Sequence, residues 1–157
     1  MGQVVPRSEL LVRRGNWKRN GVAVVCAIGH FDLLHPGHIR FLEQARTYGQ
    51  ILLVGVATEA GSASKVPLIP ASERAEILAA LAAVDFVVPI DETPDDFLQA
   101  IKPDVVVQGG AARFRSSELS QPDSSGLPPA GYKLISIPLE PGYSTAAIVQ
   151  RILQSPA

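Results

Sequence analysis

Hydrophobic residues along the chain gather in short, nearly continuous runs and seldom alternate with polar ones. Five of these runs, rich in Val, Ile and Leu, have the length of strands: Val22–Ile28, Ile51–Ala57, Phe86–Val88, Val105–Val107 and Leu134–Ile137. Continuous apolar strands are typical of sheets that are covered on both faces, as parallel sheets are. The runs therefore predict a parallel core sheet of five strands.

Segments with helical periodicity separate these runs, and each has a start signal. The segment from Gly37 to Tyr48 predicts the first helix. Ser72 is expected to cap the next one, and Ser144 the last. Thr93 is expected to cap the helix between them, because Pro94 stands at its first helical position and acidic residues follow at the positive end of the helix dipole.

Strands that alternate with helices indicate βαβ units with right-handed crossovers. We therefore expect an α/β fold, a three-layer, Rossmann-like, doubly wound sheet with a five-stranded parallel core. One domain over residues 1–157 is expected, with an N-terminal extension over 1–20 and a flexible loop over 115–131. Such sheets bind ligands at the carboxyl ends of their strands. The loops at that edge are the expected ligand-binding segments: 29–37, 58–71, 89–93, 108–132 and 138–143.

Composition supports one apolar core and excludes several classes of partner. The chain has 157 residues, of which 46% are hydrophobic and 18% charged, and this length favours one domain. A net charge of −1 gives no electrostatic basis for binding nucleic acid or an anionic membrane. No apolar run approaches the ~20 residues that a membrane-spanning helix needs.

The cellular compartment is suggested by cysteine usage and by the start of the chain. Cys26 is the single cysteine, which rules out an internal disulfide and suits a reducing compartment. The segment from Met1 to Asn20 is polar and basic, without the apolar centre of a secretion signal. We expect a cytoplasmic protein.

The segment most directly linked to chemistry joins the first strand to the first helix. It runs from Gly29 to His38 and holds all three histidines of the chain. A helix start offers free backbone N–H groups and a partial positive charge, which suit phosphate. Gly37 lets the backbone approach a ligand closely. His35 and His38, three residues apart, can face the same side, so we expect both imidazoles to donate hydrogen bonds to phosphate oxygens.

Other interpretations of the histidines compete with phosphate binding. They could be helix-capping or surface residues, but their clustering at one strand end favours the phosphate site. A zinc site with Cys26 is disfavoured, because that residue lies inside an apolar strand and the spacing fits no standard zinc pattern; we expect no metal ligands. The Walker A and G-x-G-x-x-G nucleotide motifs do not occur.

The histidine segment and four later ones resemble the HxGH cytidylyltransferase-like superfamily of nucleotidyltransferases. The resemblance extends from about Val22 to Ile152. After the first segment, from His30 to Arg46, it is carried by Pro70–Arg74, Val84–Val88, Lys102–Gly110 and Pro141–Thr145. Within the superfamily the chain looks closest to the heptose 1-phosphate adenylyltransferases, and next to the glycerol-3-phosphate cytidylyltransferases.

The resemblance implies an enzyme that transfers AMP or CMP from a nucleoside triphosphate to a phosphorylated sugar or polyol and releases pyrophosphate. His35 and His38 would hold the triphosphate and stabilise the transition state, and Lys65 would reach the phosphates from a loop. The implied nucleotide-binding residues are Ile28, Gly29, His30, Phe31, Asp32, Gly37, Arg46, Arg74, Gln108, Gly109, Gly110, Tyr143, Ser144 and Thr145. Mg²⁺ would accompany ATP or CTP, and a homodimer would be usual for the resembling family.

Several of these residues also have simpler explanations. Arg46 could lie on a solvated helix face, Lys65 could be an ordinary loop lysine, and Ser144 could serve only as a helix cap. Arg74, close behind Glu73 at a helix start, is equally compatible with a ligand contact and with a structural ion pair.

Departures from the resembling enzymes leave two classes of function open. The heptose enzymes carry Asn-Ser-Asp where this chain has Thr58-Glu59-Ala60, and Lys-Gly-Gly-Asp where it has Gln108-Gly109-Gly110-Ala111. Retention of both histidines, Arg46 and Lys65 favours a nucleotidyltransferase. The losses at Ala60, Gln108 and Ala111 favour the alternative, a catalytically degenerate nucleotide-binding module with a regulatory role.

Overall fold

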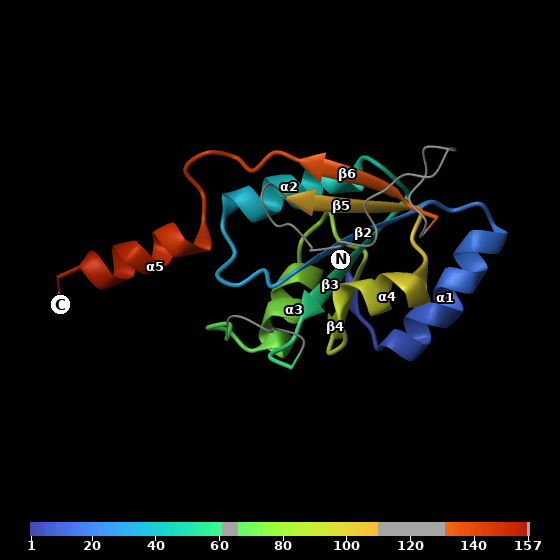
Figure 1. Ribbon diagram of the computed structural model, residues 1–157, viewed down its shortest axis with the longest axis horizontal. Coiled ribbons are helices and arrows are strands. Elements are labelled where there is room, and N and C mark those ends of the chain that lie inside the picture. The colour runs from blue at the N-terminus through green and yellow to red at the C-terminus, as the bar shows by residue number, and fades with distance from the viewer. Residues whose placement is uncertain (61–65, 110–130, 157) are drawn as a thin grey trace.

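The computed structural model of the chain describes residues 1–60, 66–109 and 131–156. Six strands and five helices lie within these residues (Figure 1). The strands are β1 (Gln3–Val4), β2 (Val24–Gly29), β3 (Ile51–Ala57), β4 (Phe86–Ile90), β5 (Val105–Gly109) and β6 (Lys133–Ile137). The helices are α1 (Arg7–Arg19), α2 (Pro36–Arg46), α3 (Ala71–Ala79), α4 (Pro94–Ile101) and α5 (Thr145–Gln154).

The strands form one parallel sheet in the order β1-β4-β3-β2-β5-β6. The chain moves outward from β2 through β3 to β4, and then returns to place β5 on the other side of β2. The crevice between β2 and β5 is therefore the switch point at which doubly wound sheets bind ligands. The predicted five-stranded parallel core is confirmed as β2 to β6, and the structure adds β1 at one edge.

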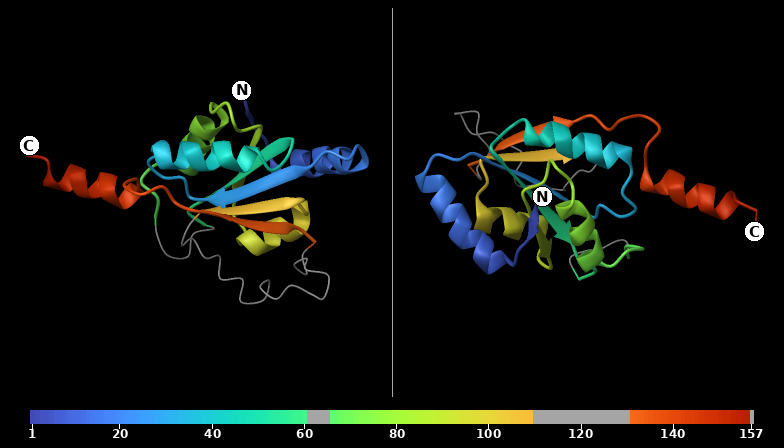
Figure 2. Two further views of the ribbon diagram at one scale, coloured as in Figure 1. Left: turned by 90° about the horizontal axis from the view of Figure 1, so that it is seen from above. Right: turned by 180° about the vertical axis from the view of Figure 1, so that it is seen from behind.

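Helices cover both faces of the sheet, so the fold has three layers (Figure 2). On one face Val25 and Ala27 of β2 belong to a core with α2 and α3, whose members include Leu42. On the other face Cys26 belongs to a core with α1 and α4, whose members include Phe97. Successive residues of a strand point to opposite faces, and both faces are buried here, which explains the unbroken apolar runs in the sequence.

The N-terminal extension over residues 1–20 is an integral part of this fold. The backbone N–H of Val5 donates to a carbonyl of β4 at 3.0 Å, so β1 covers an edge that would otherwise be unpaired. Helix α1 buries Leu10 and Arg14. The Arg14 guanidinium pairs with the Asp104 carboxylate at 3.2 Å, which ties α1 to the segment that precedes β5.

The glycine within α1 provides a test of this helix. A Cβ at Gly15 would meet no atom nearer than the Arg19 Nη1, at 3.8 Å. We expect G15A to raise the free energy of unfolding by about 0.5–1 kcal/mol, because glycine loses more conformational freedom than alanine in a helix. Urea denaturation of both proteins measures the difference. A lower free energy in G15A would contradict the helical conformation of this segment.

Two of the three predicted helix caps are confirmed. The Thr93 hydroxyl accepts a hydrogen bond from the backbone N–H three residues further on, at 3.2 Å. The Ser144 hydroxyl accepts the equivalent bond at the start of α5, at 3.0 Å. Each satisfies a backbone donor that has no partner within its helix.

The prediction that Ser72 caps α3 was wrong. The helix begins two residues earlier than that cap implies, at Ala71, and Pro70 stands at its cap position with ψ 146°. The Pro70 carbonyl accepts the first helical hydrogen bond, from the Arg74 N–H at 3.0 Å. Ser72 therefore lies inside the first turn of α3, where the residue before it has already taken up helical geometry.

Part of the predicted loops lies outside the residues that the structure describes. Residues 115–130 of the expected flexible loop lie outside the described residues, as do Lys65 and Gly110. Among the helices of the described ranges, none combines the length and the apolar character that a membrane span would require.

Candidate active site

The segment that carries the three histidines, residues 29–38, is here named the histidine turn. It leaves the carboxyl end of β2 and enters α2 beside the switch point of the sheet. The N-terminus of α5 reaches the same place, since the Thr145 hydroxyl donates to the Asp32 carbonyl at 2.7 Å. Helix N-termini carry unpaired N–H groups and a partial positive charge. Two of them meeting at one turn form a site for an anion such as phosphate.

The imidazoles of His35 and His38 stack on each other in this turn, with ring centroids 3.8 Å apart and planes at 28°. His35 is the cap residue of α2, and its backbone N–H donates to the Nδ1 of His38 at 3.3 Å. A ring nitrogen that accepts a hydrogen bond is unprotonated, so a neutral His38 carries its proton on Nε2. The backbone thus selects the tautomer in which Nε2–H is the donor left for a ligand.

Both imidazoles are neutral at neutral pH. Burial, and after it the neighbouring His35 imidazole, lower the pKa of His38 to about 4. Burial also lowers the pKa of His35. The Phe31 ring, 5.7 Å from that of His38, forms part of the apolar surroundings. The two rings therefore act toward an anion as neutral hydrogen-bond donors at this pH.

The lowered pKa of His38 predicts a loss of stability in acid. The unfolded chain protonates this side chain near pH 6.5 and the folded protein near pH 4. Between these values the unfolded state binds more protons, so the free energy of unfolding falls as the pH falls from about 6.5 to about 4. Each pKa unit corresponds to at most about 1.4 kcal/mol. Urea denaturation across this range measures the slope, and H38N is expected to flatten it; an equal slope in H38N would exclude His38 as its source.

Two non-glycine residues of the histidine turn have left-handed backbone conformations. Phe31 has φ 51° and Leu33 has φ 47°, and such conformations typically cost on the order of 1–3 kcal/mol each. Between them the Asp32 carboxylate accepts hydrogen bonds from the backbone N–H groups of Leu68, at 2.7 Å, and Ile69, at 3.1 Å. Strain held in place by long-range contacts is characteristic of functional turns.

Gly37 allows the turn and α5 to approach each other closely. A Cβ at this position would lie 2.9 Å from two atoms of the His35 ring and 2.9 Å from the Cβ of Tyr143. The Tyr143 ring is nearly parallel to that of His35, at a centroid distance of 6.3 Å and an angle of 17°. A side chain on residue 37 would therefore separate the aromatic groups that surround the turn.

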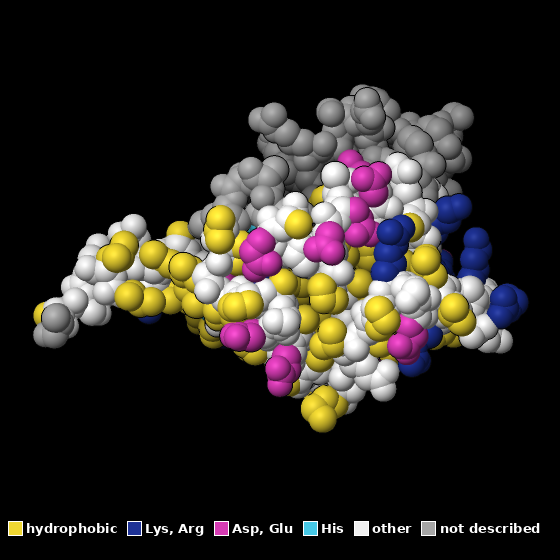
Figure 3. Space-filling model, turned by 90° about the horizontal axis from the view of Figure 1, so that it is seen from below, with side chains coloured by type: hydrophobic (Ala, Val, Ile, Leu, Met, Phe, Trp, Pro, Cys, Tyr) yellow, Lys and Arg dark blue, Asp and Glu magenta, His cyan; other side chains and the backbone are white. Residues whose placement is uncertain are grey.

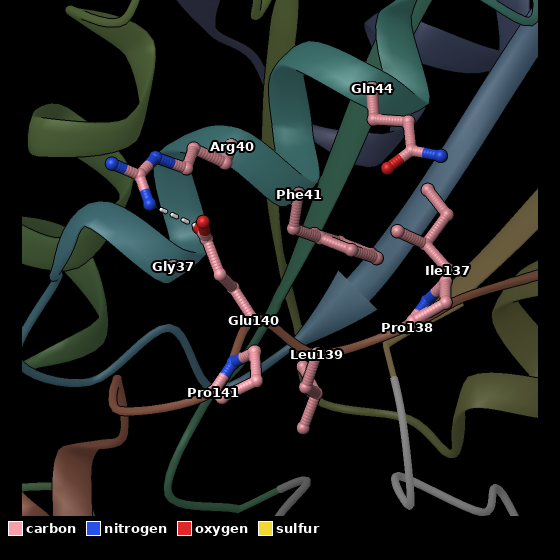
Figure 4. Close-up of a pocket in the computed structure, with 9 residues that line it drawn as sticks. All are labelled: Gly37, Arg40, Phe41, Gln44, Ile137, Pro138, Leu139, Glu140 and Pro141. Atoms are coloured by element: carbon pink, nitrogen blue, oxygen red, sulfur yellow. Dashed lines mark ion pairs between the residues drawn. The ribbon is translucent and has the colours of Figure 1, made fainter.

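A pocket of about 350 Å³ opens beside the histidine turn, between α2 and the segment that joins β6 to α5 (Figure 4). Arg40 and Glu140 form an ion pair across it, and the Arg40 guanidinium also lies 5.2 Å from the centre of the Tyr143 ring. Its lining residues are Gly37, Arg40, Phe41, Gln44, Ile137, Pro138, Leu139, Glu140 and Pro141. An aromatic and aliphatic wall with a few polar groups is typical of small-molecule sites.

The end of β5 adjoins this pocket. A Cβ at Gly109 would lie 3.2 Å from the Leu139 side chain and 3.5 Å from the Phe41 ring, so the glycine backs the pocket wall. Gln108 precedes it, in register with Ser136 of β6. These contacts bring the predicted residues of β5 to the same edge of the sheet as the histidine turn.

The side chains of two predicted nucleotide-binding residues have structural contacts. Arg46 is the last residue of α2, about 15 Å along the helix from its start. Its Nη1 donates to the Gly49 carbonyl at 2.6 Å, and its Nε lies 3.4 Å from an Asp85 carboxylate oxygen. The Ile28 side chain is buried in the core formed with α1 and α4. Arg46 therefore lies at the end of α2 that is remote from the turn.

Arg74 is fully buried and bonds to backbone carbonyls. Its Nε donates to Ile69 at 2.7 Å, and its Nη1 donates to His30 at 2.5 Å and to Ala57 at 3.0 Å. Its Nη2 lies 3.7 Å from a Glu59 carboxylate oxygen. Of the two alternatives left open by the sequence, these contacts match the structural one.

The sequence interpretation missed the wall that α2 contributes to the pocket. Arg40, Phe41 and Gln44 lie on one side of this helix, at spacings that place helical residues on a common face. That spacing, directly after the histidine motif, could have indicated a ligand-facing side of the helix. Glu140 carried no comparable signal, because its partner Arg40 is distant in the sequence.

Comparisons with known proteins identify relatives of this chain. A sequence model described as cytidylyltransferase-like matches residues 26–121. The bifunctional protein HldE of Koribacter versatilis (strain Ellin345) is 38% identical over 154 residues, which cover 95% of this chain and 31% of that protein. The protein of the same name from Magnetococcus marinus (strain ATCC BAA-1437 / JCM 17883 / MC-1) is 40% identical over 142 residues, which cover 87% of this chain and 28% of that protein. The chain thus spans about a third of the length of these relatives.

A solved structure has the same fold. The lipopolysaccharide core biosynthesis protein from Thermoplasma volcanium GSS1 superimposes with a TM-score of 0.65 at 27% sequence identity. The superposition covers 76% of this chain and 99% of that one.

Proposed function

The chain belongs to the cytidylyltransferase-like family, and from this membership we propose that it transfers a nucleoside monophosphate from a nucleoside triphosphate to a phosphorylated small molecule, with release of pyrophosphate. The observation that carries the proposal is the pair of stacked imidazoles, His35 and His38, where two helix N-termini meet. A pocket beside them offers room for the rest of a nucleotide.

The chemistry of transfer fits what these residues can do. An oxygen of the acceptor's phosphate attacks the α-phosphorus, and the bond from that phosphorus to the bridging oxygen of the leaving pyrophosphate breaks. Negative charge grows on that bridging oxygen. Phosphate oxygens would accept hydrogen bonds from the His38 Nε2–H, from the His35 imidazole and from the backbone N–H groups at the starts of α2 and α5. Hydrogen bonds from such preorganised donors strengthen as charge develops on the oxygen. No covalent intermediate on the protein is required.

We place the base of the nucleotide in the pocket between α2 and residues 137–141. The pocket begins at Gly37, so a nucleotide with its phosphates at the histidine turn can extend directly into it. Phe41 supplies an aromatic surface, Gln44 supplies an amide, and Gly109 lies behind the wall. These groups suit either adenine or cytosine, and direct competition between ATP and CTP decides which is bound.

Mg²⁺ is proposed as the counter-ion that arrives with the triphosphate, held mainly by phosphate oxygens, as is common for this ion. Within residues 1–60, 66–109 and 131–156 no group of three or more His, Cys, Asp or Glu side chains is arranged to hold a metal ion. In this proposal the residues of the turn act directly on the phosphates.

A pyrophosphate-release assay tests the function. ATP and CTP are each offered with a panel of sugar and polyol phosphates, and release is expected with one nucleotide and at least one acceptor. Calorimetry with each triphosphate is the companion measurement. Triphosphate binding without release for any acceptor would instead identify a nucleotide-binding module, and absence of binding would contradict the nucleotide site itself.

Heptose 1-phosphate is a specific member of this panel. We expect it to be a poor acceptor, because Ala60 and Ala111 stand where the resembling heptose enzymes carry carboxylates. Of these two positions, Ala111 lies outside the described residues. Each lost partner of a sugar hydroxyl typically costs about 1–3 kcal/mol, so two losses could lower the rate by on the order of 10²–10⁴. Turnover is compared with that of the best acceptor found. Efficient use of heptose 1-phosphate would contradict this expectation without affecting the reaction type.

A homodimer is part of the proposal, and α5 is the element that supports it. This helix extends away from the body of the molecule (Figures 1 and 2) and buries none of its residues. Hydrophobic side chains are prominent on its surface (Figure 3), with Ile152 62% exposed and Leu153 74% exposed. Isolated helices of this length are marginal in water, so a second copy that covers α5 would stabilise it. Light scattering of the wild type and of I152E/L153E measures the oligomeric state.

We place the protein in the cytoplasm. The support is its single cysteine, Cys26, which is buried as a free thiol in β2. Burial raises the pKa of this thiol to about 12, so it has little thiolate character, and a reducing compartment is compatible with this unpaired state.

A further inference from the structure

The backbone of the histidine turn is held from behind by a buried guanidinium. We infer that Arg74 is a positioning residue, which keeps the turn in the shape needed for nucleotidyl transfer by binding its backbone and without contacting the nucleotide. The inference rests on the proposed function. Its basis is that Arg74 has 0% exposure and that, among the described residues, it contacts the carbonyls of His30, Ala57 and Ile69 and the carboxylate of Glu59.

The first step of the argument is where the turn is strained. The left-handed residues are Phe31 and Leu33, and each follows a carbonyl that is hydrogen-bonded from another element. Arg74 of α3 donates to the carbonyl of His30, which forms the peptide that enters Phe31. Thr145 of α5 donates to the carbonyl of Asp32, which forms the peptide that enters Leu33. Both peptides that lead into the unfavourable conformations are thus held by a hydrogen bond from another helix.

The second step is that Arg74 belongs to a closed set of hydrogen bonds. The backbone N–H of Ile69 donates to the Asp32 carboxylate at 3.1 Å, and the Ile69 carbonyl accepts from the Arg74 Nε at 2.7 Å. Arg74 returns to the turn through the carbonyl of His30. The turn and the segment before α3 therefore hold each other, and neither can shift while the guanidinium keeps its bonds.

The third step is the geometry of the side chain. Three carbonyls from three separate segments surround Arg74. A guanidinium presents five N–H donors in a rigid plane, whereas the ammonium of a lysine is a compact charge with three. Lysine at this position would retain the positive charge beside Glu59 but could not reach all three carbonyls in the same way. The substitution R74K therefore separates charge from positioning.

Arg14 supplies a matched control. Its side chain is also buried, with 6% exposure, and it also donates to two backbone carbonyls, those of Ile101 and Lys102, and pairs with Asp104. These contacts lie at the amino-terminal ends of the strands, since the Asp104 carboxylate accepts from the backbone N–H of Val24 at the start of β2. R14K removes the same kind of contact at the edge of the sheet remote from the histidine turn.

The test combines kinetics with a measurement that needs no turnover. We expect R74K to lower kcat for pyrophosphate release by about 10²-fold, the typical effect of a displacement of about 1 Å at a reacting centre. The KM for the triphosphate should change much less, and R14K should keep the wild-type kcat. Long-range ¹H–¹⁵N spectra of the imidazoles should show His38 unprotonated at Nδ1 in the wild type and R14K, and a mixture of tautomers in R74K. T145V removes the other backbone contact and should shift the same His38 signals.

Each outcome is informative about the inference. Wild-type kcat and wild-type His38 spectra in R74K would overturn it, and so would equal effects of R74K and R14K, because the role would then be general stability. If R74K does not fold, R74Q is measured in its place, because its amide has two N–H donors for three carbonyls: unchanged His38 spectra overturn the inference and shifted spectra support it. Absence of nucleotidyl transfer by the wild-type protein would overturn the proposed function, and the imidazole spectra of the variants would still decide whether the turn is held in this way.

Discussion

Replacing His38 with alanine is expected to lower the turnover number for pyrophosphate release by about 10²–10³, the usual effect of removing one preorganised donor from a site that stabilises developing charge. His38 is well placed for such an effect, because its Nδ1 accepts the backbone N–H of His35 and leaves Nε2–H for the phosphates. The fold should persist, since the His38 side chain is only partly buried. Steady-state kinetics and circular dichroism together measure both consequences.

Two further substitutions at this position distinguish the role of the Nε2–H donor from that of the Nδ1 acceptor. Asparagine can place a carbonyl oxygen near the position of Nδ1, so H38N should keep the bond to the His35 backbone and still lose turnover. Glutamine can place an amide N–H near the position of Nε2, so H38Q should recover part of the rate. H35A is expected to lose turnover as well, because His35 stacks on His38 at 3.8 Å.

Three results would contradict the catalytic assignment. Unchanged turnover in H38A or in H35A would remove the corresponding imidazole from the reaction. Wild-type activity in H38N would show that the donor on Nε2 is not used. Unfolding of H38A or H35A would instead indicate that the histidines serve to start α2, which is the capping alternative.

Replacing Gly37 with alanine is the second substitution with a large expected effect. The added Cβ would lie 2.9 Å from the Cε1 and Nδ1 atoms of His35 and 2.9 Å from the Cβ of Tyr143. Separations under 3.0 Å are not sustained by real Cβ atoms, so the His35 ring or the segment before α5 must move. We expect kcat to fall by about 10²-fold, since misplacement by about 1 Å can cost this much. Steady-state kinetics with the best nucleotide and acceptor measure the loss.

The glycine of α1 is the control for this substitution. G15A also exchanges glycine for alanine within a helix, but its Cβ meets only the end of the Arg19 side chain, at 3.8 Å. It should therefore keep full activity. Full activity in G37A would show that the close packing of His35 and Tyr143 around residue 37 is not needed for transfer.

Local sequence determined the layers of the fold and the position of the histidine turn. The continuous runs at β2 to β5 could be interpreted correctly because these strands are buried on both faces and therefore lack the polar alternation of a surface strand. The caps at Thr93 and Ser144 were predictable because a cap involves only the next three residues. His35 and His38 could be placed together for the same reason, since a helix start fixes their spacing.

Contacts between distant segments could not be predicted in this way. Arg46 and Arg74 are both arginines in helices that follow strands, and nothing in their neighbourhoods separates them. The structure places Arg46 beside Asp85 at the far end of α2 and Arg74 beneath the histidine turn. The surroundings of each arginine depend on which loops meet at the edge of the sheet, and these are determined by the strand order.

The N-terminal extension and the pocket also depend on contacts between distant segments, which local sequence does not predict. Polar composition over residues 1–20 gave no sign that β1 would pair with β4, because two residues are too few for a period. The pair Arg40–Glu140 closes the pocket between segments that are far apart in the chain. The sequence by itself determined the five core strands, the caps of α4 and α5 and the histidine turn, since these depend on residues a few positions apart. Only the tertiary structure decided which side chains surround that turn, because packing brings together residues whose separation along the chain carries no periodic signal.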